Sequence, residues 1–166
     1  MIVRTLALIG GLIGGGAASQ FPEYAQQYTQ RLGGAVDALG EVVADFDASA
    51  AAEGLTRDQA LAQMHGTDFI ERRRADMTRT FDRFDQLQDD LAVLENSGPF
   101  MRAYHATRLT DDDVAQAALG SFEPAVPVNF SGIVFAGSGF SVGFLAILAA
   151  FRVLSWPFRR RQAVSG

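Results

Sequence analysis

The sequence has no cysteine and no lysine, and it holds only two histidines and one tryptophan among its 166 residues. The lack of cysteine excludes disulfides and thiolate chemistry, although it gives no information about the redox compartment. The histidines, His65 and His105, stand without thiols near them, so no transition-metal ligand spacing is present. Both are interpreted as surface residues. These absences argue against the common reactive and metal-binding sites.

Charge is distributed very unevenly along the chain. All 19 acidic residues lie between Glu23 and Glu123, whereas both ends carry only arginine. Residues 20–127 hold nine arginines against 19 acids, a net charge of −10. The two flanks together carry +5, so the overall charge of −5 is the sum of an acidic centre and two basic ends.

Two stretches are apolar enough to cross a membrane. Residues 128–151 contain no ionisable group and end against Arg152. As a helix these 24 residues would reach about 36 Å, more than the roughly 30 Å of a hydrocarbon core. Residues 1–21 combine a cationic start with an apolar run, which is also typical of a secretory signal peptide. Because a second span with basic residues follows, we favour an uncleaved signal anchor.

The positions of the arginines predict the orientation. Cationic residues near a span are retained on the cytoplasmic side, so both termini are expected inside the bacterial inner (plasma) membrane and the acidic centre in the periplasm. The predicted parts are transmembrane helix 1 (1–21), a periplasmic helical domain (22–127), transmembrane helix 2 (128–153) and a basic cytoplasmic tail (154–166). Predicted membrane-interface anchors are Arg4, Arg152, Trp156, Arg159, Arg160 and Arg161.

The sequence pattern of the central segment predicts several helices. One apolar stripe, Leu32, Val36, Leu39, Val43 and Phe46, predicts a helix over 22–47, and a second, Met77, Phe81, Phe84, Leu87, Leu91 and Leu94, predicts one over 68–96. A capping box at 56–59 starts a short helix, and two more are expected over 100–108 and 111–121, the last capped by Thr110. Pro124 and Pro127 predict an extended connection to the second span. No strand-like alternation is present.

Each apolar stripe must be buried against another element, which favours an antiparallel pair of long helices. The predicted fold class is therefore all-α: a membrane protein with two transmembrane helices and a helical-hairpin extramembrane domain.

Small residues recur at helical spacing in both predicted spans. Such residues let helix backbones approach closely in a membrane, where the hydrophobic effect does not drive helix association. The predicted packing seam comprises Ala7, Gly11, Gly14 and Ala18 in the first span and Gly132, Ala136, Gly139, Gly143, Ala146 and Ala150 in the second. Two uses remain open: packing of the two spans within one chain, and contact with another copy or another membrane protein.

Two charged clusters invite other interpretations. Arg72, Arg73 and Arg74 have acids within helical reach, which favours a solvated charged face over a nucleic-acid site. Residues 111–113 are three aspartates, but they lack the spaced ligands and the glycine of a calcium loop and suit the first turn of a helix. We therefore predict no catalytic, cofactor or metal site and no nucleic-acid partner.

Several stretches resemble an uncharacterised family of small bacterial membrane proteins. They are RTLALIGGLIGG, QFPEYAQQYTQRLGGAVDAL, FEPAVPV and WPFRR. The resemblance runs nearly end to end and implies a proteobacterial two-pass inner-membrane protein whose family carries a domain-of-unknown-function label. It implies no activity and no site residues.

The functional expectation follows from architecture. We expect a non-enzymatic inner-membrane scaffold or accessory subunit of a membrane assembly, with the lipid bilayer and itself or another inner-membrane protein as partners, in a homo- or hetero-oligomer. The alternative is a homo-oligomeric channel or pore, for which Asn129, Ser131, Ser138 and Ser141 are the only polar candidates in the second span. A sensor is disfavoured because the segment after Arg152 is too short for an output domain.

Overall fold

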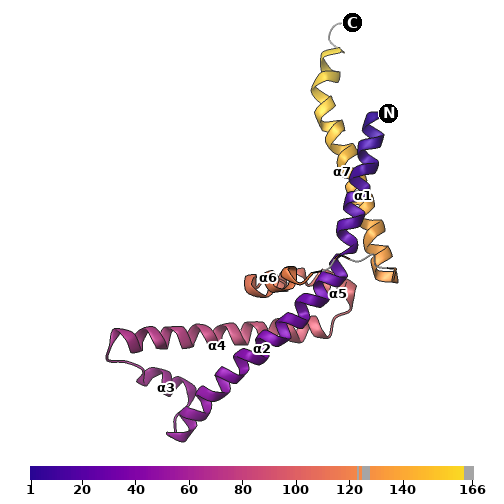
Figure 1. The fold of residues 1–166 in the computed structure, drawn as a ribbon. Coiled ribbons are helices and arrows are strands. Elements are labelled where there is room, and N and C mark those ends of the chain that lie inside the picture. Colours follow the sequence, from indigo (N-terminus) through magenta and orange to yellow (C-terminus); the bar gives the residue numbers. More distant parts are fainter. Residues whose placement is uncertain (123, 125–127, 163–166) are drawn as a thin grey trace. The chain divides into compact units, whose positions relative to one another are not determined.

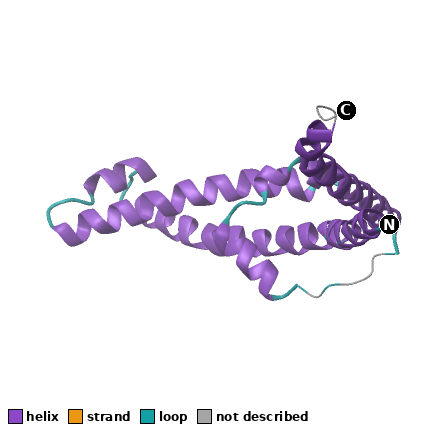
Figure 2. Ribbon diagram, turned by 90° about the horizontal axis from the view of Figure 1, so that it is seen from above, coloured by secondary structure: helices purple, strands orange, loops and turns teal. Residues whose placement is uncertain are grey.

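In the computed structural model of the chain, every regular element among the described residues is a helix (Figures 1 and 2). Residues 1–122, 124 and 128–162 are described, the last eight of them by their backbone only. The helices are α1 Ile2–Ser19, α2 Phe21–Ala52, α3 Arg57–Gln63, α4 Asp68–Glu95, α5 Pro99–Tyr104, the 3₁₀ turn η1 Ala106–Arg108, α6 Asp112–Gly120 and α7 Phe130–Gln162. The predicted all-α class is confirmed.

The chain divides into two compact units. Unit 1 comprises Met1–Ala25 and the segment from Phe122 onward, and unit 2 comprises Gln26–Ser121. Helix α2 begins in unit 1 and continues into unit 2. Only Gln20 separates α1 from α2, and its backbone keeps a right-handed helical conformation. Helix α1 therefore leads almost without a break into α2.

Unit 1 is built on α1 and α7, which lie side by side (Figure 1). Both helices are long and apolar enough to cross a membrane. Helix α7 begins at Phe130 because the side chain of Asn129 accepts the backbone N–H of Gly132 at 2.7 Å, satisfying an otherwise free helix donor. Its backbone stays helical to Gln162, well into the predicted tail. Most of the predicted 124–127 connection, including Pro127, lies outside the described residues.

Unit 2 buries the two predicted apolar stripes. Its fully buried large side chains are Tyr28 and Leu32 on α2 and Leu87 and Leu94 on α4. The helices also meet through aromatic rings: those of Phe46 and Phe81 pack edge to face with centroids 5.1 Å apart. This geometry is a favourable one for aromatic pairs.

Glycines of α2 bring α4 close. A Cβ atom built on Gly40 would lie 3.3 Å from the ring of Phe84, and one on Gly33 would lie 4.0 Å from Leu91. Residues with higher sequence numbers on α2 therefore contact residues with lower sequence numbers on α4. The two helices run in opposite directions along this contact.

The helix starts in unit 2 agree with the sequence except at α6. The Thr56 capping box is present, with the backbone N–H of Gln59 donated to the Thr56 hydroxyl and the Thr56 N–H to the Gln59 side chain. At α6 the predicted cap, Thr110, is wrong. The cap is Asp111, whose carboxylate accepts the N–H of Val114 at 3.0 Å.

The reason for the shifted cap is tertiary. Arg83 of α4 donates to the Asp111 carboxylate at 3.0 Å, and the backbone N–H of Asp111 donates to the buried Tyr28 hydroxyl at 3.0 Å. Burial opposes the charge of Arg83, but Asp111 and Asp113 outweigh it and raise the pKa of the guanidinium. Asp111 is thus held between α2 and α4.

The α2–α3 turn is closed by an ion pair. Arg57 donates to both carboxylate oxygens of Asp47, at 2.8 and 2.5 Å, and its guanidinium lies 4.6 Å from the ring centre of Phe81. The hydrogen bonds from Arg57 lower the pKa of Asp47, and the same contact raises the pKa of Arg57. A planar guanidinium is suited to such a two-point contact with a carboxylate.

Candidate functional site: the glycine contact of α1 and α7

The closest helix contact of unit 1 is formed by glycines on both helices. A Cβ atom built on Gly14 would lie 2.5 Å from the carbonyl oxygen of Gly139. One on Gly143 would collide with the carbonyl oxygen of Gly10, and one on Gly139 with Gly14 and Ala18. Because the neighbours are backbone atoms and the Cβ of Ala18, which has no freedom to rotate away, no side-chain rotation relieves these collisions. Only glycine permits the observed approach at these three positions.

Two further glycines of α1 face α7, Gly11 against a side chain and Gly15 against the backbone. A Cβ atom on Gly11 would lie 2.7 Å from the ring of Phe140, and one on Gly15 would lie 2.9 Å from the carbonyl oxygen of Ala136. The contacts again run in reverse order along the two helices, so α1 and α7 are antiparallel.

The structure brings together part of the predicted seam. Ala7, Gly11 and Gly132 are buried, and Gly14, Ala18, Ala136, Gly139 and Gly143 are partly buried. Ala146 and Ala150 are exposed. Gly10 and Gly15, which the predicted seam left out, lie in the contact, and so do the larger side chains of Phe140 and Ile147.

A spacing of four residues is the signal that could have found these positions. Gly10, Gly14 and Ala18 form one row on α1, and Gly139, Gly143 and Ile147 form another on α7. The seam predicted for α7 alternated steps of four and three, which follows the helix axis. Helices packed through their i, i+4 ridges meet along rows inclined to the axis, and such rows leave out the i+3 positions such as Ala146.

A groove of about 450 Å³ runs beside this contact. Its lining combines small residues with a few larger apolar ones: Leu12, Gly15, Gly16, Ser19, Ile133, Ala136, Gly137 and Phe140. Gly16 and Gly137 are exposed, and a Cβ atom on either would meet nothing within 4 Å. Gly16 and Gly137 therefore remain exposed, whereas the neighbouring glycines lie in the contact between α1 and α7.

A family profile described as "Protein of unknown function (DUF2937)" matches residues 2–160. The chain belongs to the DUF2937 family. No curated protein and no solved structure shows a match to it. The family resemblance inferred from the sequence is thus confirmed in its coarse form, as membership of an uncharacterised family that covers nearly the whole chain.

The predicted interface anchors of this DUF2937 protein are described in part. Arg4 and Arg152 are exposed. The side chains of Trp156, Arg159, Arg160 and Arg161 lie outside the described residues, although the α7 backbone passes through these positions.

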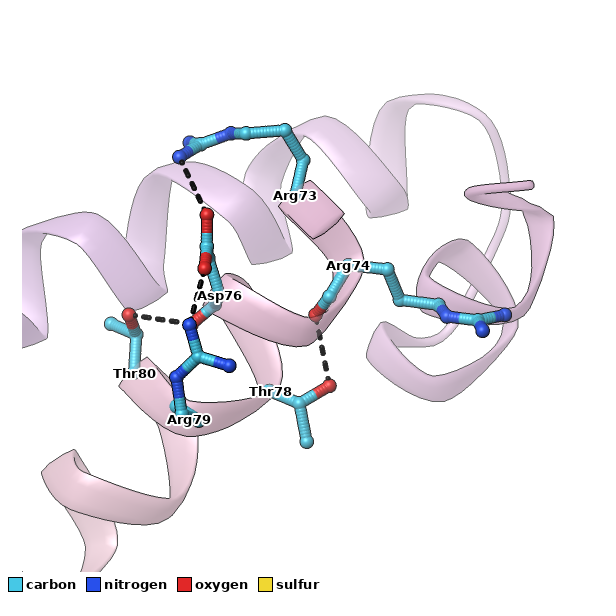
Figure 3. Close-up of polar contacts among 6 residues, drawn as sticks. All are labelled: Arg73, Arg74, Asp76, Thr78, Arg79 and Thr80. Carbon is cyan, nitrogen blue, oxygen red and sulfur yellow. Dashed lines mark hydrogen bonds and ion pairs between the residues drawn. The ribbon is translucent and has the colours of Figure 1, made fainter. Parts of the chain in front are cut away.

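The triple-arginine cluster of the DUF2937 chain lies on α4 (Figure 3). Asp76 pairs with Arg73 at 3.6 Å and also, at shorter range, with Arg79. In Figure 3 the side chain of Arg74 points away from Asp76. Asp76 therefore pairs with two arginines on one face of α4, each three residues away from it.

Two of the three aspartates at 111–113 form ion pairs within unit 2. Arg83 binds Asp111 at 3.0 Å and Asp113 at 2.9 Å. Among the residues that the structure describes, no group of three or more histidine, cysteine or acidic side chains is placed to hold a metal ion. His65 follows α3 and is exposed, and His105 follows α5, where its ring packs edge to face on Tyr104.

Proposed function

We propose that this DUF2937 protein is a two-pass inner-membrane protein that acts as a non-enzymatic scaffold or accessory subunit of a membrane assembly. In this proposal α1 and α7 cross the bilayer as a glycine-packed pair, and the groove beside them receives a transmembrane helix of a partner. The observation that carries it is that groove, with its two open glycines.

The exposed faces of the helix pair support the membrane assignment. Leu8, Leu12 and Ile13 on α1 and Val142 and Leu145 on α7 are exposed. In water each large aliphatic side chain left exposed forgoes about 1.5–3 kcal/mol of burial. Lipid removes that cost. Residues of this kind around a narrow contact of small residues are the expected pattern for paired transmembrane helices.

The arginines support an orientation with both termini in the cytoplasm and residues 22–127 in the periplasm. The cysteine-free chain allows a direct test by single-cysteine labelling with a membrane-impermeant maleimide. S49C, at an exposed position on α2, should be labelled in cells whose outer membrane has been permeabilised. I2C should be labelled only after the inner membrane is opened. The reverse pattern would contradict this topology.

The open glycines support a partner helix in the groove. Close approach of two helices needs small residues on at least one face, and Gly16 and Gly137 supply them beside the occupied α1–α7 contact. Filling the groove with a leucine should block the partner while leaving the helix pair intact, because among the described residues no atom of the facing helix lies within 4 Å of either Cβ position.

The test is crosslinking in native membranes followed by affinity purification and mass spectrometry of the tagged chain. Wild type should yield one dominant partner complex, and G16L and G137L should lose it. The matched controls are A17L and S138L, which alter the next residue on each helix at exposed positions outside the groove lining. Equal loss in the controls, or a protein that is monomeric without partners, would refute the proposal. Self-crosslinks alone would favour a homo-oligomer and make solute flux in liposomes the next measurement.

A further inference from the structure

Helix α5 of unit 2 exposes three large apolar or amphipathic side chains. Phe100 is 45% exposed, Met101 50% and Tyr104 78%. They lie within one six-residue helix, Pro99–Tyr104, so they form a single compact patch, named here the α5 patch. Phenylalanine and tyrosine at the surface of an otherwise polar, acidic domain call for a physical reason.

The α5 patch lies in the longest acid-free stretch between Glu23 and Glu123. Residues 96–110 contain no acidic residue, in a segment whose net charge is −10. Within the stretch Arg108 pairs with the buried Asp90, and Arg102 donates its Nε–H to the carbonyl of Leu94 at 3.0 Å. Arg102 also lines a groove with Asp37 and Glu95, so acidic side chains lie beside α5 although the helix itself carries none.

The patch lies at the end of unit 2 where the chain enters and leaves. Arg102 of α5 lines one groove with Gln26 and Thr29, which belong to the first turn of α2 inside unit 2. The exit is at the same end, because Arg31 donates to the hydroxyl of Ser121 at 2.5 Å. Entry, exit and α5 therefore share one end of the unit.

Chain length restricts how far this end can be from the spans. Six residues, 20–25, lie between Ser19, the last residue of α1, and Gln26. Even fully extended, the seven Cα–Cα steps from Ser19 to Gln26 would reach only about 25 Å. If α1 spans a bilayer, the end of unit 2 that carries α5 remains close to its surface, whatever the orientation of unit 2.

We infer that α5 lies in the interface of the bilayer, with the α5 patch inserted at the level of the lipid headgroups. The inference rests on the proposed membrane insertion of α1 and α7. Aromatic rings with a polar edge favour this zone, and exposed apolar side chains on a short helix gain free energy by entering it.

The test is fluorescence quenching of single tryptophans in the full-length chain. The only native tryptophan is replaced first (W156F), and one probe is then introduced as F100W, F69W or L12W. The protein is reconstituted into vesicles of phosphatidylcholine and phosphatidylglycerol whose acyl chains are brominated either near the headgroup or near the chain end. Leu12 reports on the span and Phe100 on the α5 patch.

Phe69 is the matched control. It is a phenylalanine 64% exposed on the same unit, near the start of α4. Leu91, opposite Gly33 of α2, lies 22 residues further along α4, about 33 Å away along the helix. Phe69 therefore belongs to the opposite end of unit 2 from the α5 patch.

The expected result is strong quenching of F100W by the shallow bromines, strong quenching of L12W by the deep bromines, and no quenching of F69W. If L12W is quenched but F100W is quenched no more than F69W, the inference is overturned while the membrane insertion of α1 stands. Equal quenching of F69W and F100W would also overturn it. An unquenched L12W would refute the proposed function itself. A blue-shifted but unquenched F100W would assign the patch to a protein partner and refute the lipid contact.

Discussion

The contact between Gly14 and Gly139 gives the sharpest stability prediction. In G14A the new Cβ would lie 2.5 Å from the Gly139 carbonyl oxygen and 3.3 Å from its carbonyl carbon. Real carbon–oxygen contacts are wider, so the helices must separate locally by several tenths of an ångström. Overpacking of this kind costs about 1–3 kcal/mol. The separation also weakens dispersion between the remaining contact atoms.

Alanine has an intrinsic helix advantage over glycine of about 1 kcal/mol, which would mask part of that cost. G16A corrects for it, because Gly16 is on the same helix two residues away and its Cβ would meet nothing within 4 Å. G16A should be neutral or slightly stabilising. The difference between the two variants therefore isolates the helix–helix contact, and we expect G14A to be less stable than G16A by about 1–3 kcal/mol.

The assay is unfolding of the purified chain in mixed micelles by increasing SDS. Separation of the helices is followed by crosslinking of one cysteine introduced on α1 and one on α7 at facing positions outside the glycine contact, which is possible because the chain has no other cysteine. The G14A midpoint should fall below that of G16A. Identical midpoints for G14A and G16A would refute the close backbone contact and the reasoning built on it.

Two further predictions concern unit 2. D47N should reduce the free energy of unfolding at neutral pH, because it removes the carboxylate that pairs with Arg57. The difference from wild type should shrink below about pH 4, because Arg57 lowers the pKa of Asp47 and the stabilisation is lost as the wild-type carboxylate becomes protonated. Chemical unfolding of both proteins across pH measures this difference, and a difference that does not change with pH would contradict the prediction. Y28F should lower the free energy of unfolding by about 1–3 kcal/mol, because the backbone N–H of Asp111 loses its buried acceptor. Thermal unfolding should show this loss for Y28F and none for Y104F, whose ring is exposed.

Local patterns in the sequence sufficed for the helices. The positions of Leu32 and Val36 on α2, and of Leu87 and Leu94 on α4, follow from a 3.6-residue period that any single helix must satisfy when one face is buried. The capping box at Thr56 is equally local, since both of its hydrogen bonds join residues three apart. The two apolar helices were readable from length and composition alone.

Tertiary structure decided the features that depend on a second element. Asp111 rather than Thr110 caps α6 because Arg83 and Tyr28, distant in sequence, hold it. Gly10 lies in the contact and Ala150 does not, although both are small residues on apolar helices. One helix's periodicity defines a face, but the register and inclination of the partner determine which residues of that face are covered.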